Sequence, residues 1–182
     1  MTAQYVRDAA ATAVVFGFFA LSWYGWAQEA PPRSWRVPLG IASGIALLTA
    51  VVGGLLAWRH WSAGTAFDDG TSRSFGLVVG VEFAAAALGA GLLAVRRRTE
   101  FISTWVALVV GVHLFPVAAL IGYPLIHVVA ALVTLVAVAA IPVARARSLP
   151  VSAVTGLGTG TVLLVAALSS TVLALTGYGS AV

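Results

Sequence analysis

One carboxylate inside an apolar stretch is the first feature of this chain with chemical consequences. Glu82 lies within residues 75–95, which otherwise have the composition of a membrane-spanning helix. A charged side chain at the centre of a bilayer costs about 2.5–3.5 kcal/mol on insertion scales, so such groups face a partner, a cavity or water. Glu82 therefore marks a candidate functional interior.

Two histidines and a threonine lie in the neighbouring apolar runs. With a rise of about 1.5 Å per residue, Glu82 lies about 10–12 Å, His113 about 13 Å and His127 about 5–7 Å below one membrane surface. Thr134 follows His127 by two helical turns on the same face. The sequence thus predicts a ligand- or proton-binding group that comprises Glu82, His113, His127 and Thr134.

An acid beside a histidine in an apolar environment is suited to proton exchange. Burial disfavours the charged form of a carboxyl group, and a neighbouring imidazole can accept its proton. We therefore expect a small transporter or ligand-binding membrane protein. Its pocket would face outward, and proton coupling would run through Glu82 and His113.

The same residues suggest a membrane metalloprotein or enzyme as an alternative. Glu82, His113 and His127 are the ligand types of a catalytic zinc site with two histidines and one glutamate. They lack the close i, i+4 spacing that makes such sites recognisable in sequence. A haem between the two histidines is disfavoured, because they are offset by about 7 Å along the helix axis. The sequence assigns no cofactor.

A third hypothesis is a non-catalytic membrane subunit, in which a Glu–His hydrogen bond fixes helix packing. Small residues spaced four apart allow helices to approach closely. Gly40-x-x-x-Gly44 and Gly76-x-x-x-Gly80 have this spacing, as contact faces within the bundle or in a homo- or hetero-oligomer. The run Gly156 to Gly160 resembles a nucleotide-binding loop, but it lies in an apolar segment, where close packing or a local helix break is favoured.

Composition identifies the class of protein. The 182 residues are 60% hydrophobic and 9% charged, with a mean hydropathy of +1.01. A soluble domain carries about 25% charged residues, so we expect an all-α integral membrane protein within a lipid bilayer. The net charge is +4, but the basic residues lie between apolar runs and indicate topology rather than nucleic-acid binding.

Two residue types are absent from the sequence. Without cysteine, disulfides, iron–sulfur clusters and thiolate zinc sites are excluded. All ten basic residues are arginine, so a lysine Schiff base and a P-loop are excluded as well. Arginine without lysine, in a chain rich in Ala, Val and Gly, is typical of a GC-rich bacterial genome.

The apolar runs predict one domain, residues 1–182, made of a compact bundle of six transmembrane helices. A spanning helix needs about 20 apolar residues, and Gly122-Tyr123-Pro124 divides a run that is too long for one crossing. Arg7 and Asp8 before the first run argue against a cleaved signal peptide. The predicted helices are 9–27, 37–58, 75–95, 101–122, 124–143 and 151–177.

Arginine distribution predicts the orientation. Seven arginines fall on one side, namely Arg33, Arg36, Arg96, Arg97, Arg98, Arg145 and Arg147, and three on the other, Arg7, Arg59 and Arg73. Positive charge collects on the inner side of a membrane. We therefore expect a multi-pass protein of the cytoplasmic membrane, with short loops in the cytoplasm and both termini on the outer side. Trp58, Trp61 and Tyr178 would then lie near the outer interface.

One loop of modest size, residues 59–74, is expected on the outside. Asp68-Asp69-Gly70 is typical of a turn. A weak cation site that uses Asp68, Asp69 and His60 is the less favoured interpretation.

Overall fold

The computed structural model of this protein describes residues 2–176. This described part is all-helical, with no strand. Two short 3₁₀ turns, η1 (Arg33–Trp35) and η2 (Thr99–Phe101), precede α2 and α4. All six long helices have the length and hydropathy to cross a membrane. They are α1 (Val6–Ala27), α2 (Arg36–Arg59), α3 (Asp69–Val95), α4 (Ile102–Ile121), α5 (Pro124–Arg147) and α6 (Val151–Thr176).

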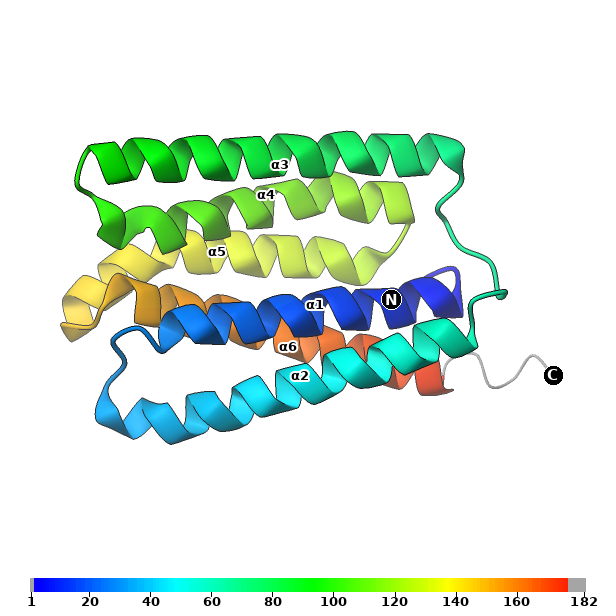
Figure 1. Cartoon of the computed structure of the whole chain (residues 1–182), viewed down its shortest axis with the longest axis horizontal. Coiled ribbons are helices and arrows are strands. Elements are labelled where there is room, and N and C mark those ends of the chain that lie inside the picture. The colour runs from blue at the N-terminus through cyan, green and yellow to red at the C-terminus, as the bar shows by residue number, and fades with distance from the viewer. Residues whose placement is uncertain (1, 177–182) are drawn as a thin grey trace.

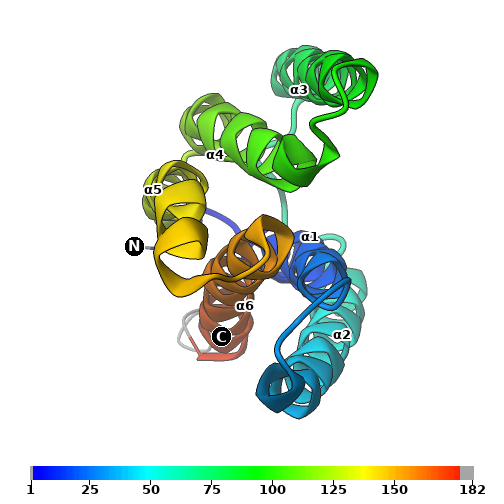
Figure 2. The same cartoon turned by 90° about the vertical axis from the view of Figure 1, so that its left-hand side faces the viewer.

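The helices lie side by side and alternate in direction (Figure 1). α1 packs against α2 and α6, α5 packs against α4 and α6, and α3 packs against α4. Seen end-on, α2 and α3 occupy separate edges of the bundle, on either side of α1 (Figure 2). The seven arginines lie in or next to the connections at one end of the bundle, which is the left-hand end in Figure 1.

Glycines allow close approach of the helices around α1. A Cβ atom on Gly156 of α6 would lie 2.5 Å from the carbonyl oxygen of Trp23, and one on Gly17 would lie 2.9 Å from the backbone nitrogen of Ala50. Gly160 lies against the ring of Tyr24 in the same way. The glycine run of α6 is therefore a packing surface in an unbroken helix, one of its two expected roles.

The Gly–Pro pair ends one helix and starts the next as expected. α4 ends at Ile121, Gly122 adopts the left-handed conformation with φ 66°, and α5 begins at Pro124. α5 continues past its predicted end at Val143 to Arg147, although Pro142 lacks the N–H of a regular helix turn. The predicted end of the sixth helix at Gly177, and Tyr178, lie outside the described residues.

The prediction that α3 begins at Phe75 is wrong by six residues. Asp68 caps the helix, because its carboxylate accepts a hydrogen bond of 2.7 Å from the N–H of Thr71. This bond lowers the pKa of Asp68 below its usual value. Asp69 and Gly70 form the first helical turn instead of a loop turn, so the connection from α2 is shorter than predicted.

Two predicted glycine faces have no partner among the described residues. A Cβ atom on Gly40, Gly44, Gly76 or Gly80 would have nothing within 4 Å. These four glycines therefore do not mediate packing inside the bundle, and contact between chains remains a prediction.

Candidate functional site

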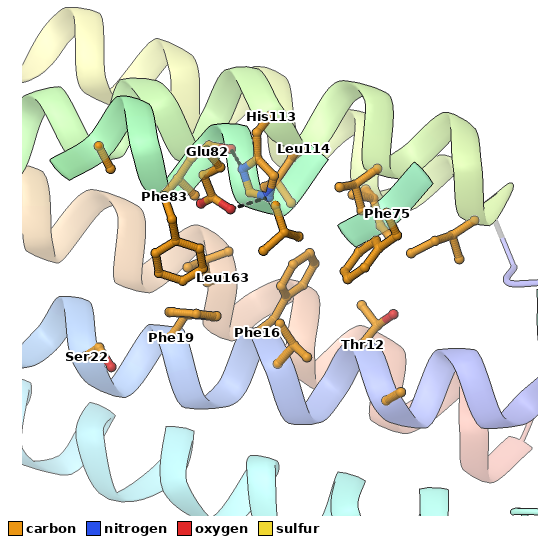
Figure 3. Close-up of a pocket in the computed structure, with 18 of the residues that line it drawn as sticks. Thr12, Phe16, Phe19, Ser22, Phe75, Glu82, Phe83, His113, Leu114 and Leu163 are labelled. Atoms are coloured by element: carbon orange, nitrogen blue, oxygen red, sulfur yellow. Dashed lines mark hydrogen bonds and ion pairs between the residues drawn. The ribbon is translucent and has the colours of Figure 1, made fainter. Parts of the chain in front are cut away.

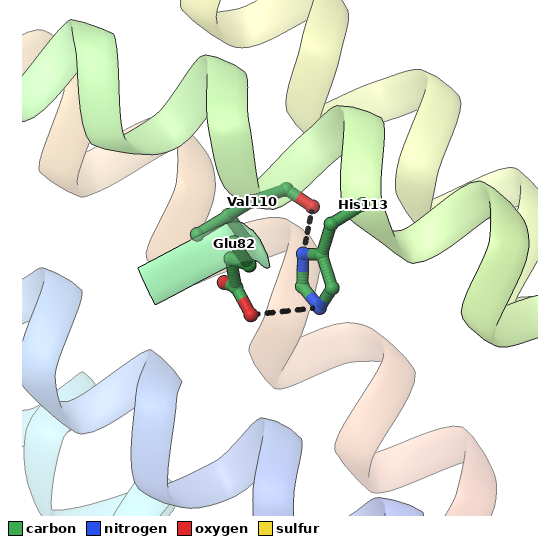
Figure 4. Close-up of polar contacts among 3 residues, drawn as sticks. All are labelled: Glu82, Val110 and His113. Carbon is green, nitrogen blue, oxygen red and sulfur yellow. Dashed lines mark hydrogen bonds and ion pairs between the residues drawn. The ribbon is translucent and has the colours of Figure 1, made fainter. Parts of the chain in front are cut away.

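The structure brings Glu82 and His113 into direct contact. Oε2 of Glu82 lies 3.1 Å from Nε2 of His113, and each side chain is only 15% exposed (Figure 4). Glu82 lies at the midpoint of α3, and His113 lies on α4, the helix against which α3 packs. Because α3 begins at Asp69, Glu82 is about 20 Å from either helix end, deeper than the estimate from Phe75.

A second hydrogen bond orients the imidazole ring. Nδ1 of His113 lies 2.8 Å from the carbonyl oxygen of Val110. A carbonyl oxygen accepts but cannot donate, so Nδ1 carries the hydrogen. Nε2 therefore either accepts a proton from the carboxylic acid of Glu82 or, when the ring is charged, donates to the carboxylate. In both forms the pair holds one shared proton and is neutral, and loss of that proton leaves one negative charge.

The pair lines a cavity of about 450 Å³ between α1 and the two helices α3 and α4. The residues drawn in Figure 3 reach into this space from both sides. The wall from α1 includes Thr12, Phe16, Phe19 and Ser22, and the opposite wall includes Phe75, Glu82, Phe83, His113 and Leu114. This volume is in the range of small-molecule sites, which are apolar with a few polar groups.

Trp105 holds α3 against α4. Its indole Nε1 donates a hydrogen bond of 3.1 Å to the carbonyl oxygen of Ala85. The ring also contacts Gly89, where a side chain would clash with the indole. Within the described helix α3, no side chain is fully buried. The wall that carries Glu82 is thus attached mainly through α4.

Asp8, at the start of α1, closes one end of the cavity and was not among the predicted site residues. Its side chain is 4% exposed and lines the cavity. Its carboxylate accepts a hydrogen bond of 2.6 Å from the hydroxyl of Thr65 and one of 2.7 Å from the N–H of Ala66. The next residue, Phe67, lines the cavity and packs edge-on against Phe75, with ring centroids 5.1 Å apart.

A neighbouring cation anchors the same loop. Arg7 lies over the ring of Trp61, 3.7 Å from its centroid, and donates a hydrogen bond of 3.1 Å to the carbonyl oxygen of Trp61. The loop from α2 to α3 is therefore tied to the start of α1 at two points. An acid directly before an apolar run was the sequence signal for this contact, but its partners are 57 and 58 residues away.

His127 and Thr134 do not join the pair. His127 is exposed on α5 and lies near the ring of Phe115, with centroids 6.4 Å apart. Thr134 donates to the carbonyl oxygen of Ala130 and packs against Gly111 between α4 and α5. Both residues lie on α5, and neither lines the cavity.

The proposed metal ligands are not assembled. Across residues 2–176, no three His, Cys, Asp or Glu side chains are grouped so that they could hold a metal ion. Glu82 and His113 meet without His127, and Asp68 serves as a helix cap rather than as a ligand beside Asp69 and His60. The arrangement of side chains therefore fits proton exchange and ligand binding better than a three-ligand metal site.

Comparison with known proteins adds no assignment. No family model, curated protein or solved structure matches this chain. The functional conclusion depends on the geometry of the cavity alone.

Proposed function

We propose that this protein is a multi-pass protein of the cytoplasmic membrane with both termini outside. Six helices of sufficient length and hydropathy support this topology. Large apolar side chains such as Val37, Ile41 and Leu48 are exposed on the bundle surface, where lipid would cover them. The end of the bundle that holds seven arginines would face the cytoplasm.

Cysteine labelling tests this topology in a chain that has no natural cysteine. Ala63→Cys lies in the α2–α3 loop, and Glu29→Cys lies between α1 and η1 at the other end. A membrane-impermeant maleimide should label Ala63→Cys in intact cells and Glu29→Cys only after permeabilisation. The opposite pattern would reverse the orientation, and equal labelling of both would contradict a spanning bundle.

We further propose that the protein binds a small molecule in the cavity and moves it across the membrane with proton coupling. The observation that carries this proposal is the Glu82–His113 pair in the cavity wall. Ionisable side chains at this depth are costly to bury, and where they occur in membrane segments they usually serve a function. It offers one exchangeable proton at a position where a ligand would lie.

Charge balance provides the coupling. With its shared proton the pair is neutral, and without it the cavity wall gains one negative charge. A ligand that binds one form better than the other shifts the proton occupancy, and the proton shifts ligand affinity by the same factor. Glu82 would hold the proton and contact the ligand, and His113 would position the carboxyl group.

A screen in proteoliposomes with a pH-sensitive dye inside tests the proposal. Organic cations, uncharged amphiphiles and organic anions are added in turn to wild type, Glu82→Gln and Glu100→Gln. Glu100 is a matched control, because it is an exposed acid at the arginine-rich end. At least one compound class should move protons with wild type and Glu100→Gln but not with Glu82→Gln. Proton movement with none of the three classes, or equal movement with Glu82→Gln, would contradict the proposal.

Association between copies of the chain is a second, compatible role that one observation favours. The glycine faces of α2 and α3 have open space around them in the single chain, and small-residue faces commonly mediate helix contacts in membranes. Gly40→Leu combined with Gly44→Leu should then reduce the mass of the particle in detergent, as measured by light scattering. An unchanged mass would contradict an interface on α2.

A further inference from the structure

We propose that the cavity binds a lipophilic organic cation in exchange for one proton. This inference rests on the proposed ligand site and names its substrate class. Three features support it: the ionisable groups in the lining, its aromatic residues, and the side from which a ligand can enter.

The ionisable side chains that line the cavity favour a positively charged ligand. They are Glu82 on α3, His113 on α4 and Asp8 on α1, while α5 and α6 contribute the apolar Ile126 and Leu163. Among the described lining residues there is no arginine. An anion would therefore find no fixed countercharge, whereas a cation would be compensated when the Glu82–His113 pair gives up its proton.

Aromatic rings line the same cavity as the carboxyl group. Glu82 and the rings of Phe83, Phe19 and Phe16 all reach into this space (Figure 3). The faces of such rings attract cations with about 0.5–2 kcal/mol per contact, and aromatic cages are the usual sites for quaternary ammonium groups. The hydroxyls of Thr12 and Ser22 donate to carbonyls of their own helix, so they add few free polar groups.

The cavity opens sideways. Val15, Phe19 and Phe83 line it but are 47%, 44% and 65% exposed, so they mark a mouth between α1 and α3. α1 and α3 are not among the helix pairs that pack together. The loop held by Asp8 covers one end. In a bilayer this mouth faces acyl chains, which favours a ligand that partitions into lipid.

The exchange is balanced in charge and protons. The cation binds to the form in which Glu82 is a carboxylate and His113 is neutral, and the shared proton leaves to the solution. The bound cation takes the place of one proton, so the total charge of the cavity and its contents does not change in the step. No bond other than the O–H or N–H bond to that proton is broken.

Binding of tetraphenylphosphonium to purified protein in detergent tests the exchange. In weakly buffered solution, about one proton should be released for each cation bound, and the affinity should rise about tenfold per pH unit over the range in which the free pair is protonated. Glu82→Gln should lose both binding and proton release, while Glu100→Gln keeps them. Since the pH slope is measured on wild type, the test does not depend on the folding of any variant.

A partly exposed aromatic residue gives a second readout. Phe83→Leu keeps apolar volume at an exposed position but removes the ring, so cation affinity should fall about two- to fivefold, as expected for one cation–π contact. Binding of 1-decanol, an uncharged amphiphile, should not change with this substitution.

The outcomes separate this inference from the function beneath it. If 1-decanol binds in a Glu82-dependent manner and tetraphenylphosphonium does not, the cavity is a ligand site but the cation inference is overturned. Cation binding without proton release, or equal binding to Glu82→Gln, overturns the exchange. If neither probe binds and no compound class moves protons in the proteoliposomes, the proposed function fails as well.

Discussion

Gly156 on α6 and Gly76 on α3 meet opposite surroundings. A Cβ atom on Gly156 would lie 2.5 Å from the carbonyl oxygen of Trp23 and 2.6 Å from the backbone nitrogen of Ala27. One on Gly76 would have nothing within 4 Å. α6 and α1 thus touch backbone to backbone, while α3 is separated from α1 by the cavity. The comparison shows a closely packed scaffold, formed by α1 and α6, and a separately attached wall, formed by α3, which carries Glu82.

The largest expected effect comes from matched leucine substitutions on the two helices. Gly156→Leu would force α1 and α6 apart, at a cost above the 1–3 kcal/mol typical of overpacking in a core. Gly76→Leu would place its side chain in open space and should stay folded. The yield of monodisperse protein and its unfolding midpoint in detergent measure this difference. Equal tolerance of both substitutions would contradict the contrast between the helices.

Removing Trp105 should loosen the wall without unfolding the scaffold. Trp105→Ala loses the hydrogen bond to Ala85 and the contact with Gly89, at a cost of about 3 kcal/mol, the lower end for deletion of a large aromatic side chain. Hydrogen exchange should increase along α3 and stay unchanged in α1 and α6. Trp58→Ala is the control, because Trp58 is an exposed side chain on α2. Uniformly faster exchange would show that α3 is not a separate unit.

Asp8 connects α1 to the loop that leads into α3. Its removal should release this loop, which lies at one end of the cavity. Asp8→Ala leaves the hydroxyl of Thr65 and the N–H of Ala66 without their acceptor, which costs about 2 kcal/mol for hydrogen bonds to a charged group. Limited proteolysis between Trp61 and Phe67 should become faster. Asp69→Ala, an exposed acid nearby, should leave the cleavage rate unchanged. A resistant loop in Asp8→Ala would mean that Arg7 and Trp61 hold it alone.

The smallest effect is expected at the cap of α3. The pKa of Asp68 is lowered by the hydrogen bond from the N–H of Thr71. The stabilisation is therefore present above the usual pKa of an aspartate and is lost as the pH falls through the lowered value. Protection of the Thr71 amide from hydrogen exchange should fall at acidic pH in wild type. Asp68→Asn should keep the cap at all pH values, and Asp68→Ala should lose it throughout. A cap that is independent of pH in wild type would contradict this account.

The helices were predictable because their signals are local. Length and hydropathy define six apolar runs, and Gly122 with Pro124 separates two of them by backbone rules that involve no distant residue. The start of α3 was missed because Asp68-Asp69-Gly70 suits a turn and a helix N-terminus equally well. The capping bond to Thr71 decides between them, and it is visible in the structure.

The candidate site was predictable only in part, because helix rotation and helix neighbours are not encoded in local pattern. Glu82 and His113 were placed in one layer by counting residues, and their helices do pack together. The same counting placed His127 near them, but His127 lies on an exposed side of α5. Asp8 was missed because its partners come from a loop far along the chain.

Nitrogen NMR of protein labelled in its three histidines tests the central claim most directly. His60 and His127 serve as internal controls for His113. The account predicts that neutral His113 carries its proton on Nδ1, and that Glu82→Gln shifts the Nε2 signal and the titration of His113 alone. A His113 that is protonated on Nε2 when neutral, or that does not respond to Glu82→Gln, would contradict the shared-proton pair and with it the assignment of the cavity as a functional site.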